Sequence, residues 1–165
     1  GARPSASALP GSRMEIDRFD ADRRILLPLF ALADDSPLQI ARYIDLGEIL
    51  VARDGIEIAG YLQLVSQGDG SAELKSMAVA EARQAAGIGR SLVAAAIKRA
   101  QHLGASRLTV STAAADTGNL RFYQRQGFRM SRIVRDAFGP SGGYAEGIVV
   151  DGIPLRDQVW LDIDL

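Results

Sequence analysis

The sequence contains no cysteine and a single histidine, His102. Without cysteine there is no disulfide framework, no thiolate nucleophile and no cysteine-ligated zinc site. One histidine cannot build a histidine-rich metal centre, and no aspartate-rich stretch has the spacing of a calcium-binding loop, so we expect no bound metal. No apolar run approaches the roughly 18–20 residues that a membrane-spanning helix needs. We therefore expect no membrane partner.

Residues 1–13 differ in composition from the rest of the chain. They are rich in Gly, Ala, Ser and Pro, they lack the apolar core of a signal peptide, and Met14 follows them. We predict that they are a tail left by cloning and that residues 14–165 form the functional domain. Without Arg3 and Arg13 the chain has 17 basic and 20 acidic residues, a net charge of −3. This balance disfavours a general nucleic-acid binder, and the lack of a targeting segment and of cysteine predicts a cytoplasmic protein.

The length and the hydrophobic pattern predict one α/β domain, with a mixed β-sheet flanked by helices. The predicted order is β-α-α-β-β-β-α-β-α-β-β. Pro28 is expected to kink the first helix or to shift its start, and residues 135–156 are predicted as a long glycine-rich connection. The predicted strands are residues 14–19, 48–53, 56–66, 71–79, 107–111, 128–134 and 157–165, and the predicted helices are residues 20–33, 37–43, 88–103 and 117–126.

The most informative segment is RQAAGIGR, residues 83–90, between a predicted strand and a predicted helix. Glycines allow backbone N–H groups to approach phosphate oxygens, and the positive end of a helix dipole attracts anions. No Lys-Ser/Thr pair follows Gly89, which excludes a Walker A loop, and Leu92 occupies the place of the third glycine of a Rossmann fingerprint. The segment predicts a phosphate-binding loop of another kind, with a plain tight turn as the alternative.

The pattern Q-x-x-G-x-G formed by Gln84, Gly87 and Gly89 resembles the signature of the GNAT superfamily of N-acetyltransferases. A second stretch, which runs from Asn119 through Tyr123 to Phe128, resembles another element of that superfamily. The resemblance is good over residues 48–134. It implies a GNAT-like fold and transfer of an acetyl group from acetyl-CoA to a primary amine of a small molecule or peptide. Homodimers are common in the family, and nothing in this sequence decides whether one forms.

The resemblance also implies which residues hold the coenzyme. The amides of residues 85–90 would bind the pyrophosphate, and the main chain of Met77 and Val79 would bind the pantetheine arm as an added strand would. Asn119 would contact the same arm. The full set of predicted coenzyme-binding residues is Met77, Ala78, Val79, Gln84, Ala85, Ala86, Gly87, Ile88, Gly89, Arg90, Asn119 and Tyr123.

Two residues are predicted to be catalytic. The absence of cysteine excludes an acyl-cysteine intermediate, so the amine must attack the thioester directly. The resemblance places a general-base glutamate at Glu73, and strand alternation puts it on the face of Met77 and Val79. Tyr123 matches a tyrosine that donates a proton to the leaving thiolate. The alternatives are a solvated carboxylate and a core aromatic residue, and Glu48 and Glu57 are weaker candidates for the base.

Charge is distributed unevenly along the chain. Residues 83–135 have a net charge of +9, whereas residues 14–82 have −7 and residues 136–165 have −5. The basic block suits a phosphate-rich coenzyme, and the acidic flanks suit a cationic or neutral amine. In the family the acceptor side is lined by segments that correspond to residues 20–45 and 135–156. We predict Tyr144 and Glu146 as acceptor contacts, because an aromatic face and a carboxylate suit an ammonium group.

Two other functions use the same residues differently. A non-catalytic acyl-CoA-binding sensor would need the segment from Gln84 to Arg90 but not Glu73 or Tyr123. A nucleic-acid-binding module would need aromatic platforms or a dense basic stripe. The basic block contains only Phe122, Tyr123 and Phe128 as aromatic residues, all within the motif already described. The enzyme is the favoured interpretation.

Overall fold

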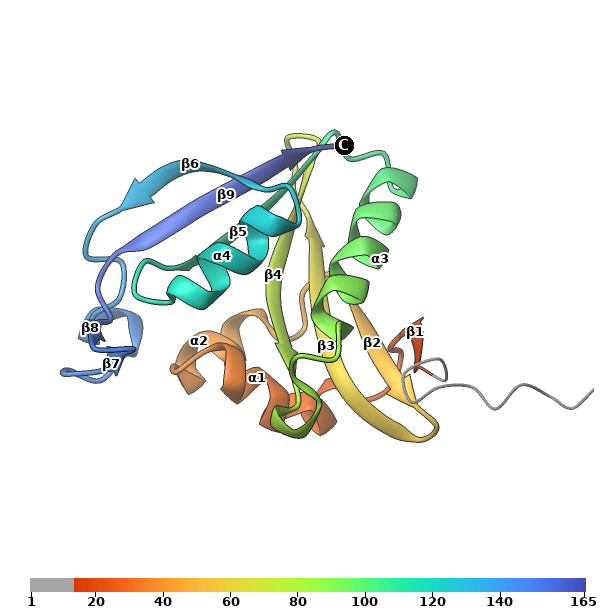
Figure 1. The fold of residues 1–165 in the computed structure, drawn as a ribbon, viewed down its shortest axis with the longest axis horizontal. Coiled ribbons are helices and arrows are strands. Elements are labelled where there is room, and N and C mark those ends of the chain that lie inside the picture. The colour runs from red at the N-terminus through yellow and green to blue at the C-terminus, as the bar shows by residue number, and fades with distance from the viewer. Residues whose placement is uncertain (1–13) are drawn as a thin grey trace, which may run out of the picture.

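The computed structural model describes residues 14–165, so the predicted tail of residues 1–13 lies outside the described residues. A seven-stranded sheet in the order β1-β2-β3-β4-β5-β9-β6 runs through the domain (Figure 1). Every neighbouring pair is antiparallel except β4 and β5, which are parallel. This is a mixed α/β domain, as the sequence predicts.

The described elements have the following bounds. The sheet contains β1 (Met14–Arg18), β2 (Glu48–Asp54), β3 (Glu57–Ser66), β4 (Ser71–Val79), β5 (Arg107–Ala113), β6 (Arg129–Val134) and β9 (Gln158–Asp164), and β7 (Val149–Val150) pairs with β8 (Ile153–Pro154) outside it. The helices are α1 (Leu27–Ala33), α2 (Pro37–Tyr43), α3 (Ile88–His102) and α4 (Thr117–Arg125), and the 3-10 turns are η1 (Arg23–Leu26), η2 (Glu81–Arg83) and η3 (Pro140–Gly142). None of these helices is long and apolar enough to cross a membrane.

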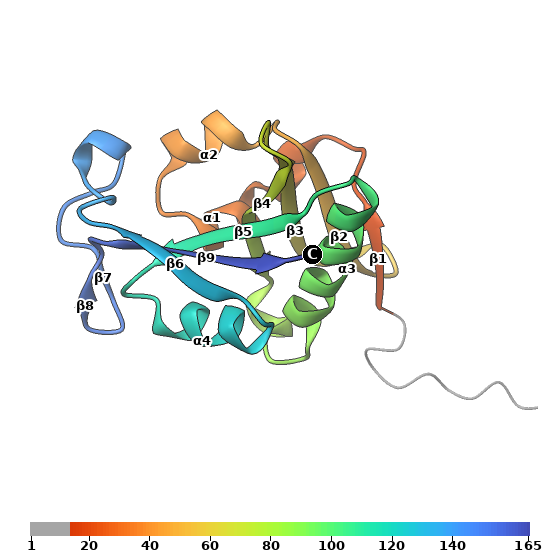
Figure 2. The same ribbon diagram turned by 90° about the horizontal axis from the view of Figure 1, so that it is seen from above.

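Strand alternation sends apolar side chains to two separate cores. On β3, Tyr61 joins the core under α1 and α2, while its neighbour Leu62 joins the core under α3 and α4. The ring of Phe30 on α1 stacks on that of Tyr61 with centroids 4.2 Å apart. Figure 2 shows α1 and α2 on one side of the sheet and α3 and α4 on the other. Helices therefore cover both faces of β3 and β4 and hold these two strands in place.

The sheet opens between β4 and β5. The two strands pair only from Ser71 with Arg107 to Leu74 with Val110, and the later residues of both strands are not paired with each other. The next residue of β4, Lys75, is an extra residue that has no partner in the register with β3. Such a bulge bends a strand and increases its twist. Figure 1 shows β4 and β5 diverging beyond this point.

The predicted order of elements is correct, and three details differ. Pro28 does shift the start of the first helix: residues 23–26 form a 3-10 turn, and α1 begins at Leu27. β5 continues to Ala113 rather than ending at Ser111. The connection of residues 135–156 is not a plain loop, because it contains η3 and the small hairpin of β7 and β8.

Candidate active site

Two clefts meet where the sheet opens. The larger, of about 990 Å³, runs from the end of β4 along the loop before α3 to α4. The smaller, of about 470 Å³, lies between the turn from α1 to α2, strands β4 and β5, and residues 137–155. The residues that line both are Leu32, Ala33, Met77, Asp116 and Asn119. A group bound in the larger cleft would thus meet a group bound in the smaller one beside the divergent ends of β4 and β5.

The loop before α3 is shaped as an anion site. Ala85 and Gly87 have positive φ angles of 66° and 80°, and the side chain of Gln84 donates to the carbonyl of Val79 at 3.1 Å. None of the amide N–H groups from residue 85 to residue 90 donates to another described residue. A Cβ on Gly89 would lie 3.4 Å from the ring of Phe122. The loop therefore offers free donors at a helix N-terminus, with little room above Gly89.

The larger cleft also has a basic wall. Arg83, Arg90, Arg121 and Arg125 line it. Arg83 pairs with Asp54 at 2.8 Å, whereas the other three have no ion-pair partner among residues 14–165. Arg125 and Phe122 are not among the residues predicted from the sequence to bind the coenzyme, and the structure places both along the cleft. Free amides together with unpaired arginines fit a ligand that carries several phosphates.

The predicted coenzyme residues occupy the two clefts as follows. All of them from Met77 to Asn119 line the larger cleft, and Tyr123 lines the smaller one. Asn119 faces both clefts, and its side-chain amide donates to the hydroxyl of Thr112 at 3.4 Å. Asp116 caps α4 by accepting the N–H of Asn119 at 3.0 Å, which fixes this corner of the site.

Tyr123 is the residue of the site that is predicted to donate a proton. The residue is buried, with 5% of its surface exposed, and its hydroxyl has no hydrogen-bond partner within residues 14–165. Burial, and to a smaller extent the negative charge of Asp116, raises the pKa of the Tyr123 phenol well above its usual value. The phenol therefore stays protonated at neutral pH and is able to donate a proton.

Glu73 is not where strand alternation predicts it. The bulge at Lys75 inverts the alternation, so Glu73 pairs with Val65 and lies on the opposite face from Met77 and Val79. Glu73 lines neither cleft. Its carboxylate accepts from Gln67 at 3.2 Å and lies 3.9 Å from the ammonium of Lys75, and burial raises its pKa. Its role as general base stays a prediction that the geometry does not favour.

The two weaker candidates for the base are held in ion pairs. The guanidinium of Arg99 contacts both carboxylate oxygens of Glu48 at 2.7 and 2.8 Å and lowers the pKa of that carboxyl. Glu57 lies 3.4 Å from Arg83. Neither residue lines a cleft. Among the described residues, no group of three or more acidic, histidine or cysteine side chains is placed to hold a metal ion.

The smaller cleft is bounded by a carboxylate that joins two distant segments. Asp34 accepts hydrogen bonds from the phenols of Tyr43 and Tyr144, both at 3.0 Å, and from the N–H of Ser36 at 2.9 Å. Tyr144 belongs to the segment of residues 137–155, which we call the strap. The carbonyl of Gly142 in the strap accepts from Gln39 at 2.9 Å. The strap is thus tied to the turn between α1 and α2.

The structure separates the two residues predicted as acceptor contacts. Tyr144 lines the smaller cleft, and its ring meets that of Phe138 edge to face, with centroids 5.2 Å apart. Glu146 is exposed and does not line the cleft. The carboxylates that do line it are Asp34, Asp35 and Asp116. Sequence patterns gave no signal that any of the three would line a cleft, although Asp116 directly precedes the predicted helix of residues 117–126.

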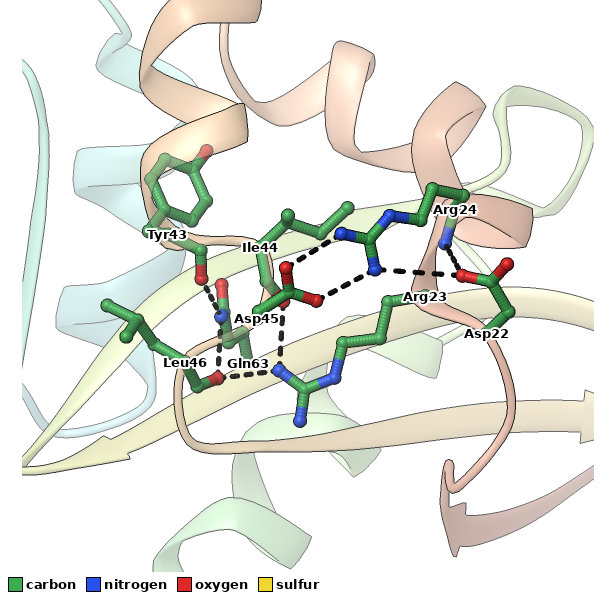
Figure 3. Close-up of polar contacts among 8 residues, drawn as sticks. All are labelled: Asp22, Arg23, Arg24, Tyr43, Ile44, Asp45, Leu46 and Gln63. Carbon is green, nitrogen blue, oxygen red and sulfur yellow. Dashed lines mark hydrogen bonds and ion pairs between the residues drawn. The ribbon is translucent and has the colours of Figure 1, made fainter.

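A second polar cluster surrounds the C-terminal end of α2 (Figure 3). This helix carries Tyr43, which lines the smaller cleft. Arg23 donates to the carbonyls of Ile44 and Leu46 at 2.8 and 2.7 Å. Gln63, which is buried, donates to the carbonyls of Tyr43 and Leu46 at 2.6 and 2.9 Å. These donors satisfy carbonyls that a helix leaves free at its C-terminus. Apart from Tyr43, the residues of this cluster line neither cleft, and the cluster fixes one wall of the smaller one.

Free amides at a helix N-terminus, opening into the gap between the diverging strands β4 and β5, suit a ligand that carries phosphates. The comparisons with known proteins give the family. The model of the Acetyltransferase (GNAT) family matches residues 20–128, and the chain belongs to this family. The chain is also 36% identical over 153 residues to the uncharacterized N-acetyltransferase YvbK of Bacillus subtilis (strain 168), covering 93% of this chain and 97% of that protein.

Solved structures agree with this assignment. An IAA acetyltransferase from Bacillus cereus ATCC 14579 is 36% identical, with a TM-score of 0.84 and coverage of 92% of this chain and 99% of that one. A GNAT family acetyltransferase from Elizabethkingia anophelis with acetyl-CoA bound is 33% identical, with a TM-score of 0.85 and coverage of 93% and 99%. The GNAT-like fold predicted from the sequence is therefore confirmed.

Proposed function

We propose that the protein transfers an acetyl group from acetyl-CoA to a primary amine of a small molecule or peptide. One observation carries this most directly: residues 85–90, whose six amides have no partner among the described residues, line the cleft that meets the smaller cleft of Tyr123 at the gap in the sheet. Bound acetyl-CoA would supply an activated thioester. The amides and the free arginines would hold its phosphates, and the unpaired edge of β4 at Met77 and Val79 would hold its pantetheine arm.

The smaller cleft supports an enzyme over a coenzyme sensor. A sensor needs only the larger cleft, whereas a transferase also needs room for an acceptor beside the thioester. The smaller cleft supplies about 470 Å³ of space, a size that suits a small molecule, since ligand sites commonly measure roughly 300–1,000 Å³. The strap bounds it on the side away from β4. These features favour a small-molecule amine over a peptide as the acceptor.

The larger cleft is tested by coenzyme affinity. Gly89→Val adds a branched side chain between the Phe122 ring and the phosphate loop, where a Cβ alone is already 3.4 Å from the ring. We expect calorimetry to show micromolar binding of CoA to the wild type, far weaker binding of ATP and NAD, and loss of CoA binding in the variant. Gly68→Ala is the matched control, because a Cβ there meets nothing within 4 Å.

Equal affinity for the three nucleotides would contradict the assignment of the cleft, as would unchanged CoA affinity in Gly89→Val. Activity is then measured by thiol release from acetyl-CoA with a library of primary amines. Turnover with at least one amine supports the enzyme. Tight CoA binding without turnover on any amine would instead favour the non-catalytic sensor.

A further inference from the structure

One carboxylate among residues 14–165 lines both clefts, and it belongs to Asp116. The other four residues at the junction are Leu32, Ala33, Met77 and Asn119, and none of their side chains accepts a proton at neutral pH. Asp116 lies in the turn between β5 and α4, directly after the strand that diverges from β4. Its side chain is therefore at the place where the acceptor nitrogen and the thioester would meet.

One oxygen of the Asp116 carboxylate is held by a hydrogen bond, and the other oxygen has no partner among the described residues. Oδ1 accepts the N–H of Asn119 at 3.0 Å as the cap of α4. Oδ2 has no hydrogen-bond or ion-pair partner among the described residues. A capping contact holds the side chain in one position, and the second oxygen keeps its lone pairs for a group in the cleft.

The other carboxylates near the site do not combine a fixed position with a free oxygen and access to both clefts. Asp34 accepts three hydrogen bonds, from Tyr43, Tyr144 and Ser36, which occupy both of its oxygens. Asp35 lines only the smaller cleft and is exposed. Glu73 lines neither cleft. Asp116 alone combines a fixed position, a free oxygen and access to both clefts.

We propose that Asp116 is the catalytic residue that takes the proton from the acceptor nitrogen, an inference that rests on the proposed acetyltransferase function. The nitrogen lone pair forms a bond to the carbonyl carbon of the thioester, and the carbon–sulfur bond breaks with its electron pair on sulfur. Asp116 receives the proton that the nitrogen loses, and Tyr123 gives its proton to the sulfur. Return of the proton from Asp116 to the Tyr123 oxygen restores both groups for the next cycle.

Charged and titratable groups line the two clefts around Asp116. These are Asp34, Asp35, Tyr43, Lys75, Tyr123 and Tyr144 around the smaller cleft and Arg83, Arg90, Arg121 and Arg125 around the larger one. The four arginines and Lys75 are basic and the two aspartates are acidic, so groups of both signs surround the carboxylate. The ionised form is the one that accepts a proton.

The test is Asp116→Asn, which keeps an oxygen able to cap α4 but removes the proton acceptor. Turnover is measured by thiol release with the amine that gives the highest wild-type rate, from about pH 5 to 10. We expect kcat/KM to fall roughly 10²–10⁴-fold, the limb of the pH profile that reports a carboxylate to disappear, and CoA affinity to stay within a few-fold. Asp22→Asn is the matched control, because Asp22 caps η1 in the same way and lines neither cleft, and it is expected to keep the wild-type profile. Glu73→Gln is measured beside it as the variant of the rival base.

Each possible result supports or overturns the role proposed for Asp116. Wild-type kinetics in Asp116→Asn, or a loss of activity in Glu73→Gln alone, overturns the inference while leaving the acetyltransferase function intact. A fall in activity that parallels a fall in thermal stability and in CoA affinity assigns Asp116 to structure and also overturns it. A wild-type protein that acetylates no amine overturns the proposed function, and the inference falls with it.

Discussion

At the scale of single residues, the proposed proton donor is Tyr123, a phenol whose pKa burial raises further above neutrality. Tyr123 contributes to the core shared by α3 and α4, where its ring meets Phe122 and Phe128 edge to face. Its hydroxyl nevertheless reaches the smaller cleft without a protein partner. An unpartnered hydroxyl at the wall of a cleft is available to donate its proton to a bound thiolate.

Tyr123→Phe should therefore lower kcat while leaving the fold and CoA affinity nearly unchanged. General acid catalysis contributes roughly 10²–10⁴-fold, so we expect a loss in that range in steady-state assays. Because the pKa of this phenol is raised, its ionisation should add no limb to the pH profile near neutrality. Tyr61→Phe is the control: it removes a buried phenol outside both clefts, so it should cost about 0.5–1.5 kcal/mol of stability and little activity. A fully active Tyr123→Phe would assign the proton to a water molecule.

At the scale of elements, two features decide how the clefts are built, and the sequence reveals one of them. The loop of residues 83–90 could be predicted, because glycine spacing and a helix start are local signals. The bulge at Lys75 could not, because it is defined by which residue of β3 faces which residue of β4. The error in the face assigned to Glu73 follows directly, since one extra residue inverts every later side chain.

The contacts of the strap also could not be predicted from local sequence patterns. Its contacts with the turn after α1 join residues more than a hundred positions apart, as in the bonds from Tyr144 to Asp34 and from Gln39 to the carbonyl of Gly142. A Cβ on Gly143 would lie 2.5 Å from the hydroxyl of Ser36. The sequence predicted a long glycine-rich connection on the acceptor side, but not its contacts with the turn after α1 and with α2. The tight packing explains why it needs glycine there.

Tyr144→Phe tests whether the strap shapes the acceptor site. The variant loses one hydrogen bond to a carboxylate, so we expect a stability loss of about 1.5–3 kcal/mol at most and a several-fold rise in KM for the amine. KM for acetyl-CoA should not change, because Tyr144 does not line the larger cleft. Thermal unfolding and steady-state kinetics measure the two effects. Glu146→Gln is the control, as this exposed residue lies outside the cleft; a larger effect there than in Tyr144→Phe would restore its predicted role.

At the scale of the whole molecule, basic residues gather at the larger cleft and acidic residues at the smaller one. Four arginines and one aspartate line the larger cleft, whereas three aspartates and one lysine line the smaller one. The uneven distribution along the sequence had suggested this separation, and folding places the two signs on either side of the junction. A phosphate-bearing donor and a cationic acceptor would therefore be attracted to different entrances.

The separation of charge predicts a preference for cationic or neutral amines. At neutral pH, KM for a cationic amine should rise several-fold as salt is raised from about 0.05 to 0.5 M, because ions screen exposed charges. KM for a neutral amine, one whose conjugate acid has a pKa below the assay pH, should stay nearly constant. Steady-state rates with matched amines check this. A preference for acidic acceptors would contradict the role assigned to the carboxylates of the smaller cleft.

The divergence of β4 from β5 has a consequence for self-association. An unpaired strand edge normally lies at the rim of a sheet, where it can pair with another chain and seed aggregates. Here the unpaired stretch of β4 from Lys75 to Val79 lies in the middle of the sheet, with α1 contacting one side and α3 the other. A neighbouring molecule cannot reach it as a strand, while a slender ligand can. The protein thus keeps a free edge for recognition that does not template aggregation.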